Sequence, residues 1–416
     1  MSKSLKQRAL RLNREYVCPN RVDTFAAAGI DLVVGDRFDY SLFDLDGREY
    51  LDFHLNGGVF NLGHCNEEIL HEISGAVSTI DIGNHHFPSL QRGELAEALA
   101  KCAPRGLHYS VFSASGSEAV DVAIKSARRH TKRRKIIGAA QGYHGRTGIS
   151  GALGDASSAR AFFSDAPPTD AVTVPFNDLE AMETALKDGD AAAVILEAMP
   201  ATDGFTLPTP DYLPGVKALC ERHGTLYIAD EVQTGLGRTG RLWGVSAFGV
   251  SPDIMVIGKG LSGGYYPIAA TMLSKDVGQW LHEDGWGHVS TFGGAELGCI
   301  VAKKVLEITQ RPETMQTVSR NAAAFKAVLT DMAKRHPFLV EVRQKGLVIG
   351  LKFGHPEGGV LMMKQLFDRG LWAIFAGFDR SVLQFKPGLL LSPEDVTESL
   401  TILEDALSAR EDAAGA

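Results

Sequence analysis

The run Ile254-Met255-Val256-Ile257-Gly258-Lys259-Gly260 is continuously apolar until it ends on a lysine held between two glycines. A second run, Thr225-Leu226-Tyr227-Ile228-Ala229-Asp230, is built in the same way and ends on a carboxylate. A strand with one exposed face alternates apolar and polar residues, whereas a strand covered on both faces is apolar throughout. Both runs therefore predict buried strands of a mostly parallel sheet with helices on its two faces.

Apolar runs and helical patterns alternate in this way from about residue 60 to residue 300. Seven runs predict strands: His108–Ser113, Lys135–Ala140, Ala171–Phe176, Ala191–Glu197, Thr225–Asp230, Asp253–Gly258 and Ala269–Ser274. Three stretches between them have helical periodicity: Ser117–Arg134, Leu179–Leu186 and Leu213–His223. This order predicts a large α/β domain with a mostly parallel seven-stranded sheet over residues 61–304.

The remaining C-terminal residues, 305–416, begin with a long helical pattern and end in a helix. Strands are expected between these helices, at Leu339–Arg343, Leu347–Phe353 and Val382–Phe385. Helices and strands that are segregated in this way predict a smaller α+β domain.

Residues 1–60 are expected to form an arm and a hairpin that pack with the smaller domain. Four apolar residues of the arm share one helical face, which suits packing on the body of the protein or on a partner subunit: Leu5, Ala9, Leu12 and Tyr16. A basic transit peptide is the alternative, because the first acidic residue is Glu15, but no Ser-rich stretch follows. The hairpin is predicted over residues 39–53, around an Asp46-Gly47 turn.

The composition is that of an ordinary globular protein, with 416 residues, 44% of them hydrophobic and 22% charged. The 42 basic residues against 50 acidic ones give a net charge of −8, which argues against nucleic acid as the main partner. No apolar run approaches the ~20 residues that span a bilayer, so no membrane partner is expected.

Five cysteines are present, an odd number without a CxxC pair: Cys18, Cys65, Cys102, Cys220 and Cys299. This pattern favours reduced thiols and a cytoplasmic location over a disulfide framework or a zinc site, and no other metal site is predicted.

Four polar, glycine-rich stretches follow predicted strands, at the edge where open α/β sheets bind ligands. The first passes from Ser113 into a helix through Ser115, Gly116 and Ser117, whose N–H groups and hydroxyls suit an anion. A simple serine cap, with a glutamate near the first helical position, explains the same residues equally well. In the second stretch, Tyr143 and His144 can meet a planar ligand, although a structural role is the alternative.

Asp230 and Lys259 belong to the third and fourth stretches. A carboxylate after so apolar a strand needs a positive partner, which is a cationic heterocycle nitrogen, a nearby arginine or a helix N-terminus. Enclosure of a lysine disfavours its ammonium form and so prepares a nucleophile. The two residues are 259 − 230 = 29 positions apart, about one strand–connection–strand unit. We therefore expect them to face one ligand from neighbouring strand ends.

The segment Gly235-Leu236-Gly237-Arg238-Thr239-Gly240 matches the GxGxxG pattern of dinucleotide sites. Such a site requires a helix that begins at the glycines. Because Gly244, Gly249 and Pro252 follow, a helix is not expected there, and neither is a nicotinamide dinucleotide.

Taken together, the four stretches resemble the class III (ω-amino acid type) aminotransferases, pyridoxal 5′-phosphate enzymes of fold type I. The likeness begins at Leu42–Asp52, continues through Asn61–His64 and extends past Thr291–Gly294. Residues 230–240 followed by Gly258-Lys259-Gly260 are specific to the family as a set. The resemblance implies a fold type I enzyme that binds pyridoxal 5′-phosphate and forms at least a homodimer.

The resemblance also implies roles for individual residues. Lys259 resembles the lysine that forms the Schiff base and later moves a proton, and Asp230 resembles the partner of the pyridine nitrogen. The other implied cofactor contacts are Ser115, Gly116 and Ser117 at the phosphate, Tyr143 with His144 beside it on one ring face, Val232 on the other face, and Gln233 near the ring hydroxyl.

Two further positions are implied by the family. Thr291 resembles a threonine that reaches the phosphate of the neighbouring subunit's cofactor. Glu197 stands where the family keeps a glutamate near the substrate, although Ala198-Met199-Pro200 replaces the usual immediate proline.

One departure from the family pattern bears on the substrate. Many relatives carry an arginine, followed three residues later by Pro-Pro, that grips the substrate's carboxylate. Here Gln384 stands at the position of the arginine and Gly388 replaces the second proline. Strand alternation places Gln384 and Lys386 on one side, so Lys386 either supplies a charge to the substrate or is simply solvated.

The resemblance and this departure together predict an aminotransferase for a primary amine or ω-amino acid. Pyruvate is favoured over 2-oxoglutarate as the keto-acid acceptor, because the arginine is missing. The alternatives are a lyase of the same family, which eliminates ammonia or phosphate from an amino-alcohol derivative, and an aminomutase.

Overall fold

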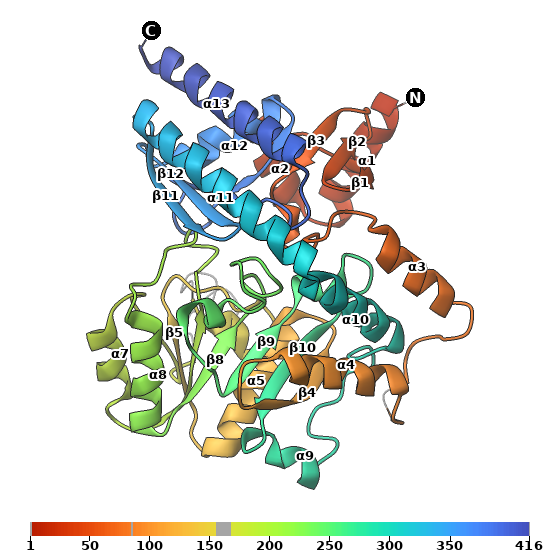
Figure 1. Ribbon diagram of the computed structural model, residues 1–416, viewed down its shortest axis with the longest axis vertical. Helices are drawn as coiled ribbons and strands as arrows, with labels where there is room; N and C mark the ends of the chain where they lie inside the picture. The colour runs from red at the N-terminus through yellow and green to blue at the C-terminus, as the bar shows by residue number, and fades with distance from the viewer. Residues whose placement is uncertain (1, 85, 155–167, 416) are drawn as a thin grey trace.

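The computed structural model describes residues 2–84, 86–154 and 168–415. Figure 1 shows a lower lobe built on one large sheet and an upper lobe made from both ends of the chain. The large sheet has seven strands: β4 (Leu107–Ser113), β5 (Lys135–Ala139), β6 (Ala171–Val174), β7 (Ala191–Glu197), β8 (Leu226–Asp230), β9 (Ile254–Ile257) and β10 (Ala269–Ser274). Each lies within two residues of its predicted limits.

The strand order is β4-β10-β9-β8-β7-β5-β6. Strands β9, β8, β7, β5 and β6 pair in parallel, and β10 runs antiparallel to both of its neighbours. The prediction of a mostly parallel seven-stranded α/β sheet of fold type I is therefore confirmed. Parallel pairing places the carboxyl ends of β5, β7, β8 and β9 at one edge.

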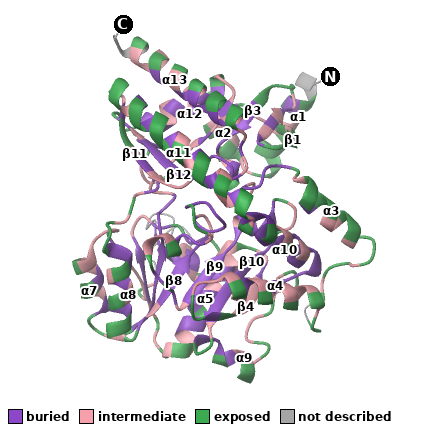
Figure 2. Cartoon of the chain, viewed as in Figure 1, coloured by how far each residue is buried: buried purple, intermediate pink, exposed green. Residues whose placement is uncertain are grey.

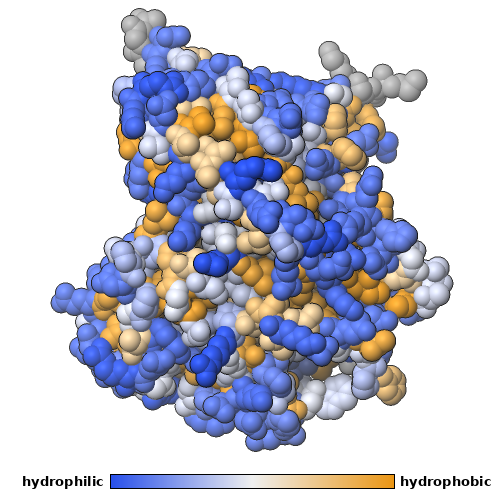
Figure 3. Space-filling model, in the orientation of Figure 1, coloured by the Kyte–Doolittle hydropathy of each residue, from blue (hydrophilic) through white to orange (hydrophobic). Residues whose placement is uncertain are grey.

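Both faces of the sheet are covered at its centre, which explains why β7, β8 and β9 are apolar up to their carboxyl ends. On one face, Ile195, Ile228 and Val256 pack with α5 (Gly116–Thr131). The opposite face packs against four helices: α4 (Leu90–Cys102), α7 (Leu179–Leu186), α8 (Tyr212–His223) and α10 (Glu296–Gln310). Figure 2 shows the resulting concentration of buried residues in the sheet, and Figure 3 shows mostly hydrophilic residues, with separate hydrophobic patches, on the face in view.

The upper lobe contains two small sheets. One has the order β1 (Val34–Phe38), β2 (Ser41–Asp44), β3 (Glu49–Asp52) and β13 (Leu371–Trp372), and the other β11 (Leu339–Lys345), β12 (Val348–Phe353), β15 (Val382–Phe385) and β14 (Ile374–Phe375). The helices of this lobe include α11 (Pro312–Arg335), α12 (Gly358–Asp368) and α13 (Pro393–Gly415). The hairpin β2–β3 has the predicted position, whereas β1, β13 and β14 were not expected from the sequence.

Because β3 pairs in parallel with β13, the two ends of the chain share one sheet. Figure 1 shows these N-terminal and C-terminal elements side by side, above the large sheet. We propose the division into residues 1–60, 61–304 and 305–416 on this basis. The limit at 304/305 falls inside α10, which packs with α4 and α3 (Glu67–Ala76) of the lower lobe and leads into α11.

The N-terminal arm forms α1 (Ser2–Tyr16), followed by α2 (Pro19–Ala27). Its expected apolar face is not the face that packs on the body, because Leu5, Leu12 and Tyr16 are exposed. The arm is held instead by Lys6, which is buried and lies 2.6 Å from Asp44 Oδ2. The ion pair with Asp44 stabilises the buried Lys6 amine. Because Lys6 faces the body of the protein, the apolar face of α1 is exposed to solvent in the single chain.

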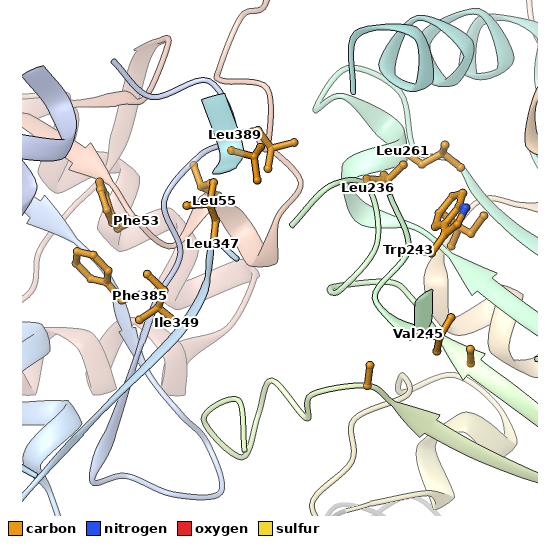
Figure 4. Close-up of a cluster of buried hydrophobic side chains, with 14 of the residues drawn as sticks. Phe53, Leu55, Leu236, Trp243, Val245, Leu261, Leu347, Ile349, Phe385 and Leu389 are labelled. Carbon is orange, nitrogen blue, oxygen red and sulfur yellow. The ribbon is translucent and has the colours of Figure 1, made fainter. Parts of the chain in front are cut away.

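Tyr40 ties the hairpin to the C-terminal segment. Its hydroxyl donates to the Asn61 carbonyl and accepts from the Leu390 N–H, both at 3.0 Å. A Cβ at Gly388 would overlap the Tyr40 ring, which explains why no proline stands there. Beside this contact, the rings of Phe53 and Phe385 lie 4.5 Å apart within an apolar cluster (Figure 4).

Residues 235–240 form turns, and no helix begins at their glycines, so the GxGxxG segment is not a dinucleotide site. The next helical element is the short 3-10 helix η3 (Val245–Phe248). Over the described part of the chain, no helix has both the length and the apolar character that a membrane crossing requires.

We predict that Gly388→Ala lowers the free energy of unfolding by about 3 kcal/mol, because the added methyl must displace the Tyr40 ring from its two hydrogen bonds. Urea denaturation followed by circular dichroism measures the change. The control is Gly285→Ala, where an added Cβ has no neighbour within 4 Å. Equal stability of the two variants would contradict this account of Gly388.

Candidate active site

A cavity of about 180 Å³ lies at the carboxyl edge of the large sheet. Its lining joins the ends of β5, β7, β8 and β9 to the start of α5: Ser115, Gly116, Ser117, Tyr143, His144, Gly145, Glu197, Asp230, Val232, Gln233 and Lys259. All the residues predicted for the cofactor of the same subunit are thus brought together. Thr291, Gln384 and Lys386 do not line this cavity.

Lys259 is the first residue of the 3-10 helix η4 (Lys259–Ser262), directly beyond β9. Its φ of 43° lies in the left-handed region, which costs a residue with a side chain about 1–3 kcal/mol. Gly57 packs so closely on it that a Cβ there would lie 2.7 Å from Lys259 Cε. No acceptor among the described residues is hydrogen-bonded to Nζ, and enclosure lowers the pKa of Lys259 despite the nearby Asp230 and Glu197. A lowered pKa favours the neutral amine, which is the form that acts as a nucleophile.

Asp230 ends β8 and is held by two donors. The Val232 N–H donates to Oδ1 at 3.0 Å, and His144 Nδ1 lies 2.8 Å from Oδ2. Burial opposes the charged imidazole, but the Asp230 hydrogen bond and the charges of Asp230 and Glu197 outweigh it and raise the pKa of His144. These two contacts fix the orientation of the Asp230 carboxylate, and both Asp230 and His144 line the cavity.

Ser115, Gly116 and Ser117 form the turn into α5. Ser115 is the cap of this helix, with its hydroxyl accepting the Glu118 N–H at 3.2 Å. The expected glutamate lies at the third helical position, not near the first, and accepts the Ala114 N–H at 2.9 Å. The first backbone N–H groups of α5, together with the helix dipole, still face the cavity as an anion site.

The donor set fits pyridoxal 5′-phosphate. The helix N-terminus suits its phosphate, Asp230 its ring nitrogen and Lys259 its aldehyde. Two buried side-chain atoms at the cavity, Gln233 Oε1 and His144 Nε2, have no hydrogen-bond partner. Buried polar atoms normally have partners, so an unpaired Gln233 Oε1 indicates that a ligand with a donor group belongs beside it.

Gln384 and Lys386, the two residues predicted for the substrate, are buried and do not line this cavity. Lys386 Nζ donates to Gln384 Oε1 at 2.7 Å, so strand alternation does place them on one side. The alternative of a solvated Lys386 is wrong, because this side chain is 2% exposed. Burial, with the positive charges of Arg238 and Lys259, lowers the pKa of Lys386 well below its ordinary value.

Thr291 is exposed, in the segment between α9 (Trp280–Glu283) and α10. Its predicted contact lies in a second subunit, so this role stays a prediction.

The sequence reasoning missed Arg146, which contacts two residues of the cavity lining, Tyr143 and Ser117. The Arg146 guanidinium lies 5.5 Å from the centre of the Tyr143 ring, and the backbone N–H of Arg146 donates to Ser117 Oγ at 3.2 Å. The side chain is exposed and makes no ion pair with the described residues. Its place three residues after Tyr143, in the second of the four glycine-rich stretches, was the available signal. Gly57 was also missed, because its packing on Lys259 joins segments 202 positions apart, 259 − 57.

Comparisons with known proteins agree with this geometry. A family model described as aminotransferase class-III matches residues 31–407. An uncharacterized aminotransferase of Archaeoglobus fulgidus is 46% identical, over 92% of this chain and 89% of its own. An acetylornithine aminotransferase of Caldanaerobacter subterraneus is 34% identical, over 93% and 97%. A crystal structure of the Toxoplasma gondii ornithine aminotransferase, with pyridoxal phosphate at its active site, superposes with a TM-score of 0.88 and 25% identity, over 98% and 95%.

We predict that Lys259→Ala abolishes the visible absorbance of a covalently attached cofactor and lowers turnover at least 10²–10⁴-fold, because the proton-transfer group is lost. An absorption spectrum of the purified variant with added pyridoxal 5′-phosphate is the measurement. Lys275→Ala, which removes an exposed lysine beyond β10, serves as the control. A wild-type band that survives in Lys259→Ala would disprove the assignment.

Proposed function

The chain belongs to the class III aminotransferases, enzymes that use pyridoxal 5′-phosphate, and we propose that it transfers the amino group of a primary amine or ω-amino acid to a keto acid, with pyruvate favoured. The observation that carries the proposal is a single cavity in which Lys259, Asp230 and the N-terminus of α5 face one another. These are the three groups that a pyridine ring with an aldehyde and a phosphate requires.

Each group has a distinct task. When bound, the cofactor supplies an electron-withdrawing ring that stabilises negative charge next to the substrate nitrogen. The backbone N–H groups at Ser115–Ser117 would fix the phosphate, and the Asp230 carboxylate, braced by His144, would hold a proton at the ring nitrogen. Lys259 Nζ, with its lowered pKa, accepts a proton at its own nitrogen and returns it.

Arg146 supports an ω-amino acid as the donor. It is a cation that contacts two residues of the cavity lining, and among the described residues it has no acidic partner. A carboxylate at the far end of a substrate would pair with this guanidinium while the amine reaches Lys259.

Gln384 and Lys386 support pyruvate as the acceptor. An arginine would present a permanent two-pronged cation to a carboxylate. In its place this chain has an amide hydrogen-bonded to an amine whose pKa is lowered. A keto acid that needs two firmly held carboxylates, such as 2-oxoglutarate, is therefore disfavoured relative to pyruvate.

We also propose a homodimer. Four large apolar side chains are between 50% and 73% exposed: Phe87, Leu90, Trp286 and Phe292. The segments that carry them lie together, because the His86 and Trp286 rings are 5.3 Å apart and Arg92 donates to Glu296 at 3.2 Å. Such a patch is typical of a subunit interface, and Thr291 lies within it, where it could reach a neighbouring cavity.

A cytoplasmic location completes the proposal. All five cysteines are free in the structure, and three of them are at least partly exposed: Cys18, Cys65 and Cys102. Unpaired, accessible thiols persist in a reducing compartment.

The function is tested by mixing the holoenzyme with an amine alone. We expect visible absorbance to fall by one cofactor equivalent and to return when pyruvate is added, because the amino group stays on the protein until an acceptor arrives. The panel contains propylamine and 4-aminobutyrate, with 2-oxoglutarate as the competing acceptor. Release of ammonia without a keto acid would instead identify the lyase.

Arg146→Leu is the matched variant for this experiment. The KM for 4-aminobutyrate should rise about 10- to 100-fold, which corresponds to loss of a charged hydrogen bond, while the KM for propylamine should not change. Equal changes for both amines would show that Arg146 does not contact the carboxylate.

For the homodimer, we predict that Phe292→Asp yields monomers in sedimentation velocity, because an interface cannot bury an unpaired carboxylate cheaply. Phe38→Asp, which places the same charge at an exposed phenylalanine of β1, should leave the dimer intact. A wild-type chain that sediments as a monomer would refute the proposal directly.

A further inference from the structure

Two carboxylates stand side by side at the ligand edge of the sheet. Glu197 is the last residue of β7 and Asp230 the last of β8, and the parallel register pairs them directly. Glu197 is 5% exposed and Asp230 4% exposed, and both line the cavity. Like charges this close and this well buried cannot both be stable without positive partners.

Each carboxylate accepts a hydrogen bond from the backbone of a different residue that lines the cavity. Glu197 Oε1 accepts the N–H of Tyr143 at 3.0 Å, whereas Asp230 Oδ1 accepts the N–H of Val232 at 3.0 Å. Tyr143 and Val232 are the two residues predicted to cover opposite faces of the cofactor ring. The second oxygen of Glu197 accepts the Ala201 N–H at 3.2 Å, which anchors this carboxylate to the loop after β7.

The charged groups around Glu197 come from three directions. They are Asp230 from β8, His144 from the loop after β5, and Lys259 beyond β9. Burial and then the Asp230 charge raise the pKa of Glu197 to about 7, against the opposing effects of His144 and the two backbone donors. Burial beside Asp230 therefore favours the protonated form of Glu197 at a pH where an ordinary glutamate is ionised.

We propose that Glu197 is a positioning residue which, as a carboxylate, holds Tyr143 against the cofactor ring, and which releases its proton to solvent when the cationic ring nitrogen enters beside Asp230. The positive nitrogen offsets the Asp230 charge that otherwise keeps the proton on Glu197. The ionised carboxylate is then the stronger acceptor for the Tyr143 N–H. Binding of the ring therefore strengthens the hydrogen bond that holds Tyr143 beside it. This inference rests on the proposed function, because it takes Asp230 as the partner of the ring nitrogen.

The test uses pyridoxine 5′-phosphate, which has the ring and the phosphate but no aldehyde. It is titrated calorimetrically into the full chain freed of cofactor, in two buffers of different ionisation enthalpy, to count protons. At pH 7 the wild type should release more protons on binding than Glu197→Gln, and this difference should shrink as the pH is raised, because Glu197 is then already ionised before the ring binds. The affinity of the wild type for pyridoxine 5′-phosphate, relative to that of Glu197→Gln, should accordingly increase as the pH rises through 7.

Asp253→Asn is the control, since this carboxylate binds Lys217 and the Tyr227 N–H and does not line the cavity. It should release as many protons as the wild type. Equal proton counts for the wild type and Glu197→Gln would overturn the proposal.

If Glu197→Gln does not fold, difference infrared spectra of the wild type decide. Loss of a protonated carboxyl band on binding supports the proposal, and its absence refutes it. Because the probe forms no covalent bond with Lys259, this result is independent of whether amino transfer occurs.

Discussion

Parallel hydrogen bonding between β7, β8 and β9 is the constraint on which the site depends. It aligns Glu197 with Asp230 in register and brings the end of β9, with Lys259 just beyond it, to the same edge. An antiparallel neighbour would point its own carboxyl end the other way, as β10 does. Backbone pairing thus decides which positions meet at this edge of the sheet, and the residue at each strand end decides which chemical group is presented there.

Charge in this enclosed edge is stable only as a network. Asp230 is held by His144 and by a backbone N–H, and Glu197 by two backbone N–H groups. Lys259 Nζ lies near both carboxylates, and no described residue accepts a hydrogen bond from it. Burial in this arrangement lowers the pKa of the Lys259 amine, although the two carboxylates oppose the shift. A cofactor that brings a cationic nitrogen to one end and an anionic phosphate to the N-terminus of α5 completes the balance that the protein alone leaves open.

The upper lobe contributes through contacts between the ends of the chain. Tyr40 fixes the segment around Leu390, β3 pairs with β13, and Gly57 closes on the Lys259 side chain. The first two contacts join the N-terminal and C-terminal segments to each other, and the third packs the N-terminal segment against the edge of the large sheet. In the same lobe, Gln384 and Lys386 form a buried pair joined by a hydrogen bond.

Much of this protein follows from the sequence by itself. The seven strands were predicted from short apolar or β-rich runs, and the central ones are apolar because they are buried on both faces. The glycine-rich strand ends pointed to the residues that the cavity brings together. The sequence could not show that Lys386 is buried, that Leu5, Leu12 and Tyr16 face outward, or that β13 and β14 exist, since two-residue strands carry no periodicity. Tertiary structure also decided the roles open to Glu197, Arg146 and Gly57. Their neighbours are distant in the chain, and both burial and electrostatic interaction depend on distance in space, which local sequence patterns do not encode.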